Sequence, residues 1–64
     1  MKIKDLKKGD LFTINAIPEP RKNQVYIRGE YDKSNKTYSC TRYDDMNNER
    51  FYKGDKPVFV SFTF

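Results

Sequence analysis

The sequence contains no histidine, a single cysteine and only three scattered glycines. Without histidine, the most common general acid or base of enzymes is missing. One cysteine cannot supply the several thiolate or imidazole ligands of a tetrahedral zinc site. Isolated glycines do not form the glycine-rich loop that cradles nucleotide phosphates. We therefore expect a protein that is not an enzyme and that uses no catalytic residue, metal or cofactor.

Long apolar stretches are also missing. No run approaches the roughly 20 apolar residues that cross a membrane, and Met1 to Lys4 lacks the apolar core of a signal peptide. Cys40 has no second cysteine to pair with, whereas small secreted domains usually need several disulfides. These features predict a cytoplasmic protein with no membrane partner.

The length of 64 residues predicts a single small domain, spanning 1–64. A chain this short buries only about 60% of its unfolded surface, so its core must be thin. Five tyrosines and five phenylalanines compensate, because large rings give the most buried area per residue. We expect a folded domain of marginal stability.

Charge is distributed unevenly along the chain. The net charge is +4 and the isoelectric point is about 9.3. Residues 1–8 form a basic N-terminal segment, whereas acidic and amide side chains gather in residues 44–49. That later cluster lacks the glycine and the ligand spacing of a calcium-binding loop. It is interpreted as a polar connection whose side chains bond their own backbone.

Alternation of apolar and polar residues predicts strands throughout. The clearest strand is expected at Val58 to Phe64, and another at Leu11 to Asn15. Prolines in Ala16 to Asn23 predict a loop, because proline lacks a backbone donor. A short strand is expected at Arg50 to Lys53, ending in a tight turn.

The middle of the chain predicts a hairpin closed by a four-residue turn at Lys33–Lys36. Glycine in the first strand of this hairpin is interpreted as a sharp bend. The predicted opposite pairs are Tyr31 with Tyr38, Gly29 with Cys40 and Ile27 with Arg42.

This register assigns each side chain of the hairpin to a face, because the side-chain period of a strand is two. The face expected to point inward carries Val25, Ile27, Tyr31, Tyr38 and Cys40. The face expected to point outward carries Tyr26, Arg28, Glu30, Ser39, Thr41 and Tyr43.

Together these elements predict an all-β fold, a small five-stranded SH3-like barrel. The alternative is an OB-like barrel, which usually holds a helix between its third and fourth strands. Residues 44–49 offer fewer than two helical turns for it, so the SH3-like barrel is preferred.

Several short strings resemble small proteins of gut bacteria and their phages that have no established function. They are the opening KKGDLFT at 7–13, the central VYIRGEYD at 25–32 with YSC at 38–40, and the closing KGDK at 53–56. The resemblance implies an accessory protein of a phage or mobile element. It brings no site residues with it.

The preferred functional hypothesis is a nucleic-acid-binding module. Tyrosines on a strand face can stack on the bases of a single strand, and basic side chains can bind its phosphates. The candidate residues are Tyr26, Arg28 and Tyr43 on the outward face, with Lys2, Lys4, Lys7, Lys8, Arg21 and Lys22 around it.

The alternative is a protein interaction module, an inhibitor or adaptor of another protein. It would dock through the proline loop Ile17 to Lys22 or through the edge of a strand. An open edge at the phenylalanine-ended terminal strand would also allow pairing with a second copy, giving a homodimer.

Overall fold

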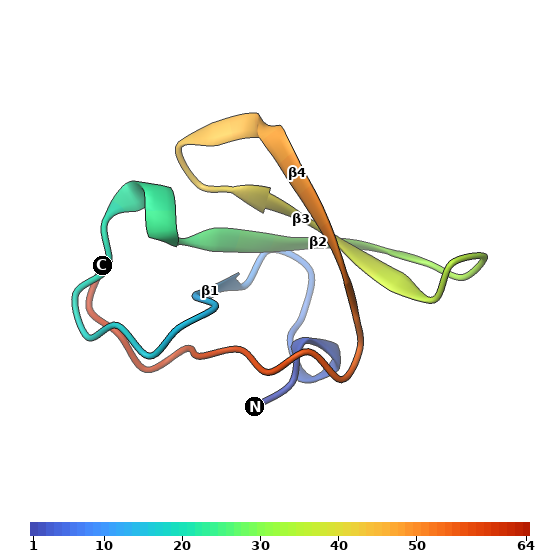
Figure 1. Ribbon diagram of the computed structural model, residues 1–64, viewed down its shortest axis with the longest axis horizontal. Coiled ribbons are helices and arrows are strands. Elements are labelled where there is room, and N and C mark those ends of the chain that lie inside the picture. The colour runs from blue at the N-terminus through green and yellow to red at the C-terminus, as the bar shows by residue number, and fades with distance from the viewer.

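The computed structural model describes residues 1–64 and consists of one antiparallel sheet with two short 3-10 turns (Figure 1). The strands are adjacent in the order β1-β2-β3-β4. The all-β prediction is therefore confirmed. The elements are η1 (Ile3–Asp5), β1 (Leu11–Phe12), η2 (Lys22–Gln24), β2 (Tyr26–Asp32), β3 (Thr37–Arg42) and β4 (Asp45–Lys53).

The β2–β3 hairpin extends away from the rest of the molecule (Figure 1). Its turn lies where it was predicted, because Tyr31 pairs with Tyr38 and Asp32 with Thr37. The Asp32 carboxylate accepts hydrogen bonds from Ser34 N at 2.9 Å and from the side-chain amide of Asn35 at 2.8 Å. The bond from Asn35, followed by that from Ser34, holds the pKa of Asp32 below its ordinary value.

A β-bulge interrupts this hairpin between Arg28 and Tyr31. Arg28, not Gly29, lies opposite Cys40, so two residues of β2 face Ser39 alone. Gly29 is required here, because a Cβ atom would lie 2.7 Å from the carbonyl oxygen of Ser39. The predicted pairs Gly29 with Cys40 and Ile27 with Arg42 are therefore wrong by one residue.

The bulge exchanges the two faces of β2 on its N-terminal side. Tyr26 points into the core, where it is only 9% exposed and its ring stacks on Phe12 at a centroid distance of 6.0 Å. Ile27 takes the opposite face. The outward position predicted for Tyr26 and the inward position predicted for Ile27 are thus wrong, whereas Cys40 and Tyr38 face the core as predicted.

We call the side of the sheet that faces the core the inner face, and the opposite side the outer face. The N-terminal segment packs against the inner face, and Ile3 is completely buried there. Residues 1–8 are therefore a docked segment with exposed lysines. The core comprises Ile3, Leu6, Phe12, Tyr26, Cys40 and Val58, with Ile14, Tyr38 and Tyr52 packed against it.

The predicted fifth strand at Val58 to Phe64 is absent. This segment runs below the sheet (Figure 1) and forms no ladder. Its contacts with the first part of the chain are the isolated bridge of Thr13 with Phe59 and single backbone hydrogen bonds from Val58 N to Met1 O and from Thr63 N to Pro18 O. β1 is only two residues long, which leaves little backbone for a partner strand. The sheet is therefore open, and the SH3-like barrel is not confirmed.

Two smaller expectations also change. β4 begins at Asp45, so most of the predicted polar connection belongs to a strand, and only a tight turn at Tyr43 and Asp44 separates β3 from β4. That turn leaves no room for the helix of an OB-like barrel. Neither 3-10 turn has the length or the apolar character that a membrane-crossing helix needs.

The bulge yields a stability prediction. Gly29→Ala should lower the free energy of unfolding by about 1 to 3 kcal/mol, because the added methyl group collides with backbone that cannot move freely. The urea midpoint measures this loss. Gly54→Ala is the matched control, since its Cβ would lie 3.3 Å from Lys4 Cβ and 3.4 Å from Tyr38 Cε2, both side-chain atoms. Equal midpoints for Gly29→Ala and the unaltered protein would contradict the bulge.

Candidate functional site

A row of aromatic side chains with cations beside them lies on the inner face. Tyr38 and Tyr52 are cross-strand partners on β3 and β4, and both are half-buried. The Arg28 guanidinium lies 4.3 Å from the ring centre of Tyr38, and Lys56 Nζ lies 5.4 Å from that of Tyr52. We call the set Arg28, Tyr31, Tyr38, Arg50, Tyr52 and Lys56 the inner-face row.

The hairpin end of this row is aromatic. The rings of Tyr31 and Tyr38 lie 4.7 Å apart in a tilted arrangement. Arg28 donates a hydrogen bond from Nη1 to Gly29 O at 2.8 Å, yet its buried Nε has no partner. A buried donor without a partner is costly. The guanidinium is therefore only partly satisfied by the chain itself.

A pocket of about 270 Å³ opens at the other end of the row. Tyr26 and Tyr52 form part of its wall, and the Arg50 guanidinium lies 5.8 Å from the ring centre of Tyr26. Arg50 is exposed and has no carboxylate within ion-pair distance. Its charge is available to a ligand.

Amide side chains complete the polar part of the pocket. Gln24 Oε1 accepts a hydrogen bond from Arg21 N at 2.9 Å, which leaves its NH₂ group free. Asn15 and Asn23 line the same pocket, and their side chains form no hydrogen bond within the chain. Isoleucines Ile14 and Ile17 supply the apolar part of the wall.

The predicted outward face made of Tyr26, Arg28 and Tyr43 does not exist. Tyr26 is in the core, and Arg28 lies on the inner face. Tyr43 is 42% exposed, and its ring packs edge-on against Phe64 at a centroid distance of 4.8 Å. The bulge turns Tyr26 and Arg28 together to the inner face, because both precede Gly29 in β2, whereas Tyr43 lies in the turn after β3.

The predicted basic residues fall into two groups. Arg21 and Lys22 are exposed at η2, directly before the pocket residues Asn23 and Gln24. The four lysines of the N-terminal segment, Lys2, Lys4, Lys7 and Lys8, are exposed on the docked segment.

Two contacts place these lysines relative to the row. Lys4 N donates to Gly54 O at 3.2 Å, which brings Lys4 close to the C-terminal end of β4. Lys8 forms an ion pair with Glu30, and this bond and charge hold the pKa of Glu30 below its ordinary value. Lys4 thus lies near the row, whereas the charge of Lys8 is compensated by Glu30.

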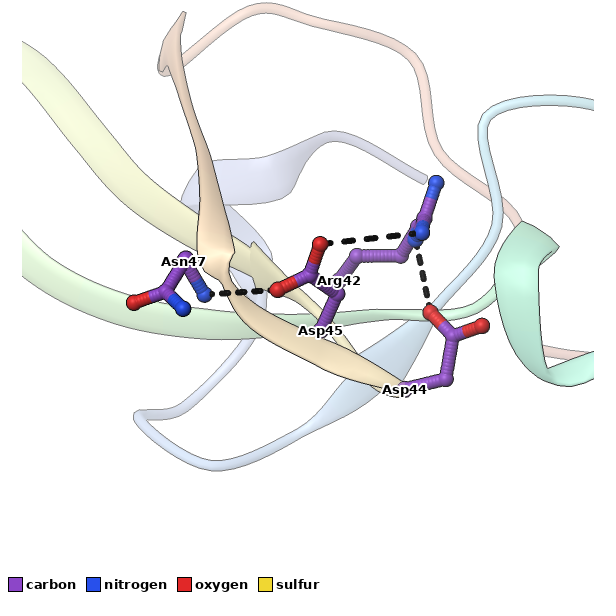
Figure 2. A network of polar contacts seen from close by, with 4 residues as sticks. All are labelled: Arg42, Asp44, Asp45 and Asn47. Carbon is purple, nitrogen blue, oxygen red and sulfur yellow. Dashed lines mark hydrogen bonds and ion pairs between the residues drawn. The ribbon is translucent and has the colours of Figure 1, made fainter.

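The acidic cluster after β3 is occupied by an arginine of the same chain (Figure 2). Arg42 Nε lies 2.6 Å from Asp44 Oδ1, and its Nη2 lies 3.9 Å from Asp45 Oδ2. Asn47 N donates to Asp45 Oδ1 at 3.1 Å, so the bonding of this cluster to its own backbone is confirmed. These acids lie in the turn after β3 and at the start of β4, where contacts within the chain hold them in place.

Sequence reasoning missed Arg50, Tyr52 and Lys56 as site residues. The spacing of Arg50 and Tyr52 by two could have placed them on one strand face. Which face this is depends on the pairing with β3, and only the structure supplies that register. The pocket amides lie in loops, where no periodicity predicts their position.

Cys40 is the one nucleophilic thiol, and it is completely buried in the core. Burial raises the pKa of the Cys40 thiol to about 11, against smaller opposing effects of the Gly29 backbone and the Arg28 charge. Since the thiolate is the reactive form, the folded protein should be inert to thiol reagents.

We predict that Cys40 in the folded protein reacts with a disulfide reagent at pH 8 only as fast as the chain opens, and that it reacts rapidly in urea. The unfolded thiol ionises near about 8.5. Burial of the neutral Cys40 thiol therefore contributes fully to the free energy of unfolding below that pH, and this contribution is lost as the pH rises through about 11. Cys40→Ala should lack this alkaline component, and rapid labelling of the native protein would contradict the burial.

Comparison with protein-family models gave no match, and neither did comparisons with curated proteins and with solved structures. The resemblance to small proteins of gut bacteria and phages stays a prediction that rests on the quoted strings. The function must therefore be argued from the side chains of the chain itself.

Proposed function

We propose that this protein is a small non-enzymatic module that binds single-stranded nucleic acid along the inner-face row and the adjoining pocket. One observation carries the proposal. Arg50 presents an unpaired guanidinium at a pocket walled by Tyr26 and Tyr52. The proposed binding surface is therefore the inner face of the sheet and not the outward face that the sequence predicted.

The chemistry of the row suits a single strand. Bases stack on aromatic rings at a gain of roughly 1 to 3 kcal/mol per base, and arginine adds cation–π contacts. Tyr31 and Tyr52 retain exposed ring surface, and Arg50 and Lys56 lie beside rings at distances typical of cation–π pairs. Bases within a duplex are already stacked on each other, so the row favours unpaired ones.

The charge distribution supports the same proposal. Among the basic side chains only Lys8 and Arg42 form ion pairs, so the rest of the positive charge is free. All acidic side chains except Glu19 and Asp55 accept hydrogen bonds within the chain. Near the pocket, Arg21, Lys22 and Arg50 offer three cations to a phosphate backbone.

We also propose that the open sheet is an incompletely closed form of an SH3-like barrel. The bridge between Thr13 and Phe59 is supported by two backbone hydrogen bonds, of 2.9 and 3.0 Å. It brings the final segment back beside the first strand, as closure of a small barrel requires. The tight turn between β3 and β4 favours this comparison over an OB-like one.

The proposal predicts the effect of two substitutions on the binding of a labelled single-stranded oligonucleotide. Arg50→Ala should weaken binding and reduce the salt slope by about 0.7, the value for one phosphate contact. Tyr52→Ala should cost roughly 1 to 3 kcal/mol of binding, the value of one stacked base. Fluorescence anisotropy at about 50 and 200 mM salt measures both.

Two residues of the same strand serve as controls. Lys53 and Phe51 alternate with Tyr52 along β4, so their side chains lie on the outer face. Lys53→Ala should change affinity little compared with Arg50→Ala, and Phe51→Ala little compared with Tyr52→Ala. Circular dichroism verifies that each variant is folded. Absence of binding by the unaltered protein at low salt, or equal losses on both faces, would contradict the proposal.

A protein interaction module is the second candidate, and the position of β4 favours it. β4 is an edge strand with no neighbour on one side, and Met46 and Phe51 are 63% and 57% exposed. A free edge can add a strand from a partner. The proline loop is less suited, because Pro20 is buried and Pro18 O accepts a hydrogen bond from Thr63 N.

Sedimentation velocity tests the case in which this partner is a second copy. Pairing through β4 predicts a dimer whose fraction rises with protein concentration. The dimer should persist at high salt and be weakened by Phe51→Lys. Lys53→Arg is the control, because it alters the same strand without changing its charge. A monomer at every concentration would exclude a homodimer formed through this edge.

A further inference from the structure

We propose that the pocket takes one unstacked base of the bound strand and reads its edge through side-chain amides, with adenine favoured. This inference rests on the proposed function, because a strand must first bind along the inner-face row. It adds base selectivity to a row that by itself would accept any base.

The size of the pocket fits one base. Pockets for drug-sized ligands span roughly 300 to 1,000 Å³, and this one measures about 270 Å³. It is therefore too small for a dinucleotide but adequate for a single planar ring system. Tyr26, Tyr52 and the two isoleucines provide apolar surface for the faces of the ring.

The polar groups of the pocket are unoccupied by the chain. The carboxamides of Asn15 and Asn23 each offer an acceptor and donors, and Gln24 adds its free NH₂ group, while its oxygen already accepts one hydrogen bond from Arg21 N. Such groups need partners when a ligand displaces water from them. A base edge, with donors and acceptors side by side, supplies those partners.

The set of groups favours adenine over the other bases. Asparagine and glutamine amides bind adenine bidentately, accepting from its amino group and donating to a ring nitrogen. No carboxylate lines the pocket, and carboxylates are the usual acceptors for the amino group of cytosine. Arginine commonly reads guanine, but Arg50 carries the phosphate contact in the proposed function. Guanine selectivity is therefore the principal competing outcome.

The test uses four oligothymidine strands that differ only at the central position, which is dA, dT, dC or dG. Competition against a labelled strand compares their affinities for the unaltered protein. The dA strand should bind about fivefold tighter or more than the other three, the lower end of what one bidentate contact provides. Asn15→Ala or Asn23→Ala should remove the preference, so that the dA strand binds no tighter than the all-thymidine strand to either variant.

Asn47→Ala is the matched control. Asn47 is an exposed asparagine in β4 whose side chain points away from the Arg42 cluster (Figure 2), and it does not line the pocket. This variant should keep the full preference for dA. Circular dichroism again verifies folding of all three variants, each of which changes an exposed side chain.

The outcomes separate the inference from the proposed function. Equal, salt-sensitive binding of all four strands would overturn base reading by the pocket and leave single-strand binding intact. A preference for dG that is lost in Arg50→Lys would overturn the choice of adenine. Binding of none of the strands at low salt would refute the proposed function itself.

Discussion

The close contact between Gly29 and the backbone of Ser39 determines which side chains of β2 lie in the core. Only a residue without a Cβ atom fits there, and the resulting bulge places Gly29 and Glu30 together opposite Ser39. Before the bulge, Tyr26 turns inward and stacks on Phe12. Without this shift, Ile27 would occupy the core and Tyr26 could not form a wall of the pocket.

The place of Arg28 in the inner-face row depends on the same register. Arg28 reaches the ring of Tyr38 because it shares a face with Cys40, its partner across the hairpin. Because the domain is small, its core is thin, and the half-buried Tyr38 and Tyr52 cover core surface that aliphatic residues would cover in a larger protein. Stabilisation of the fold and presentation of stacking surface are therefore served by the same rings.

The sequence predicts the parts of this structure that depend on local chemistry. The hairpin turn follows from Asp32 and its neighbours, and the pairing of Tyr31 with Tyr38 follows from the turn. Gly29 indicates an irregularity in β2, but a glycine within a strand is typical of both a bend and a bulge. Only the bulge shifts the pairing with β3 by one residue. The terminal alternation at Val58 to Phe64 did not produce a strand, because a strand also needs a partner, and β1 offers only two residues. Arg50 and the pocket amides could not be found in advance, since they meet only in three dimensions.

We propose that the inner face, to which the bulge brings Tyr26 and Arg28, is the binding surface. Titration of ¹⁵N-labelled protein with a short single-stranded oligonucleotide, followed by chemical-shift changes in NMR spectra, tests it most directly. We predict the largest changes at Asn23, Tyr26, Arg50 and Tyr52, with little change at Thr41 and Phe51 on the outer face. Changes confined to the outer face or to the N-terminal lysines, or no changes at low salt, would contradict it.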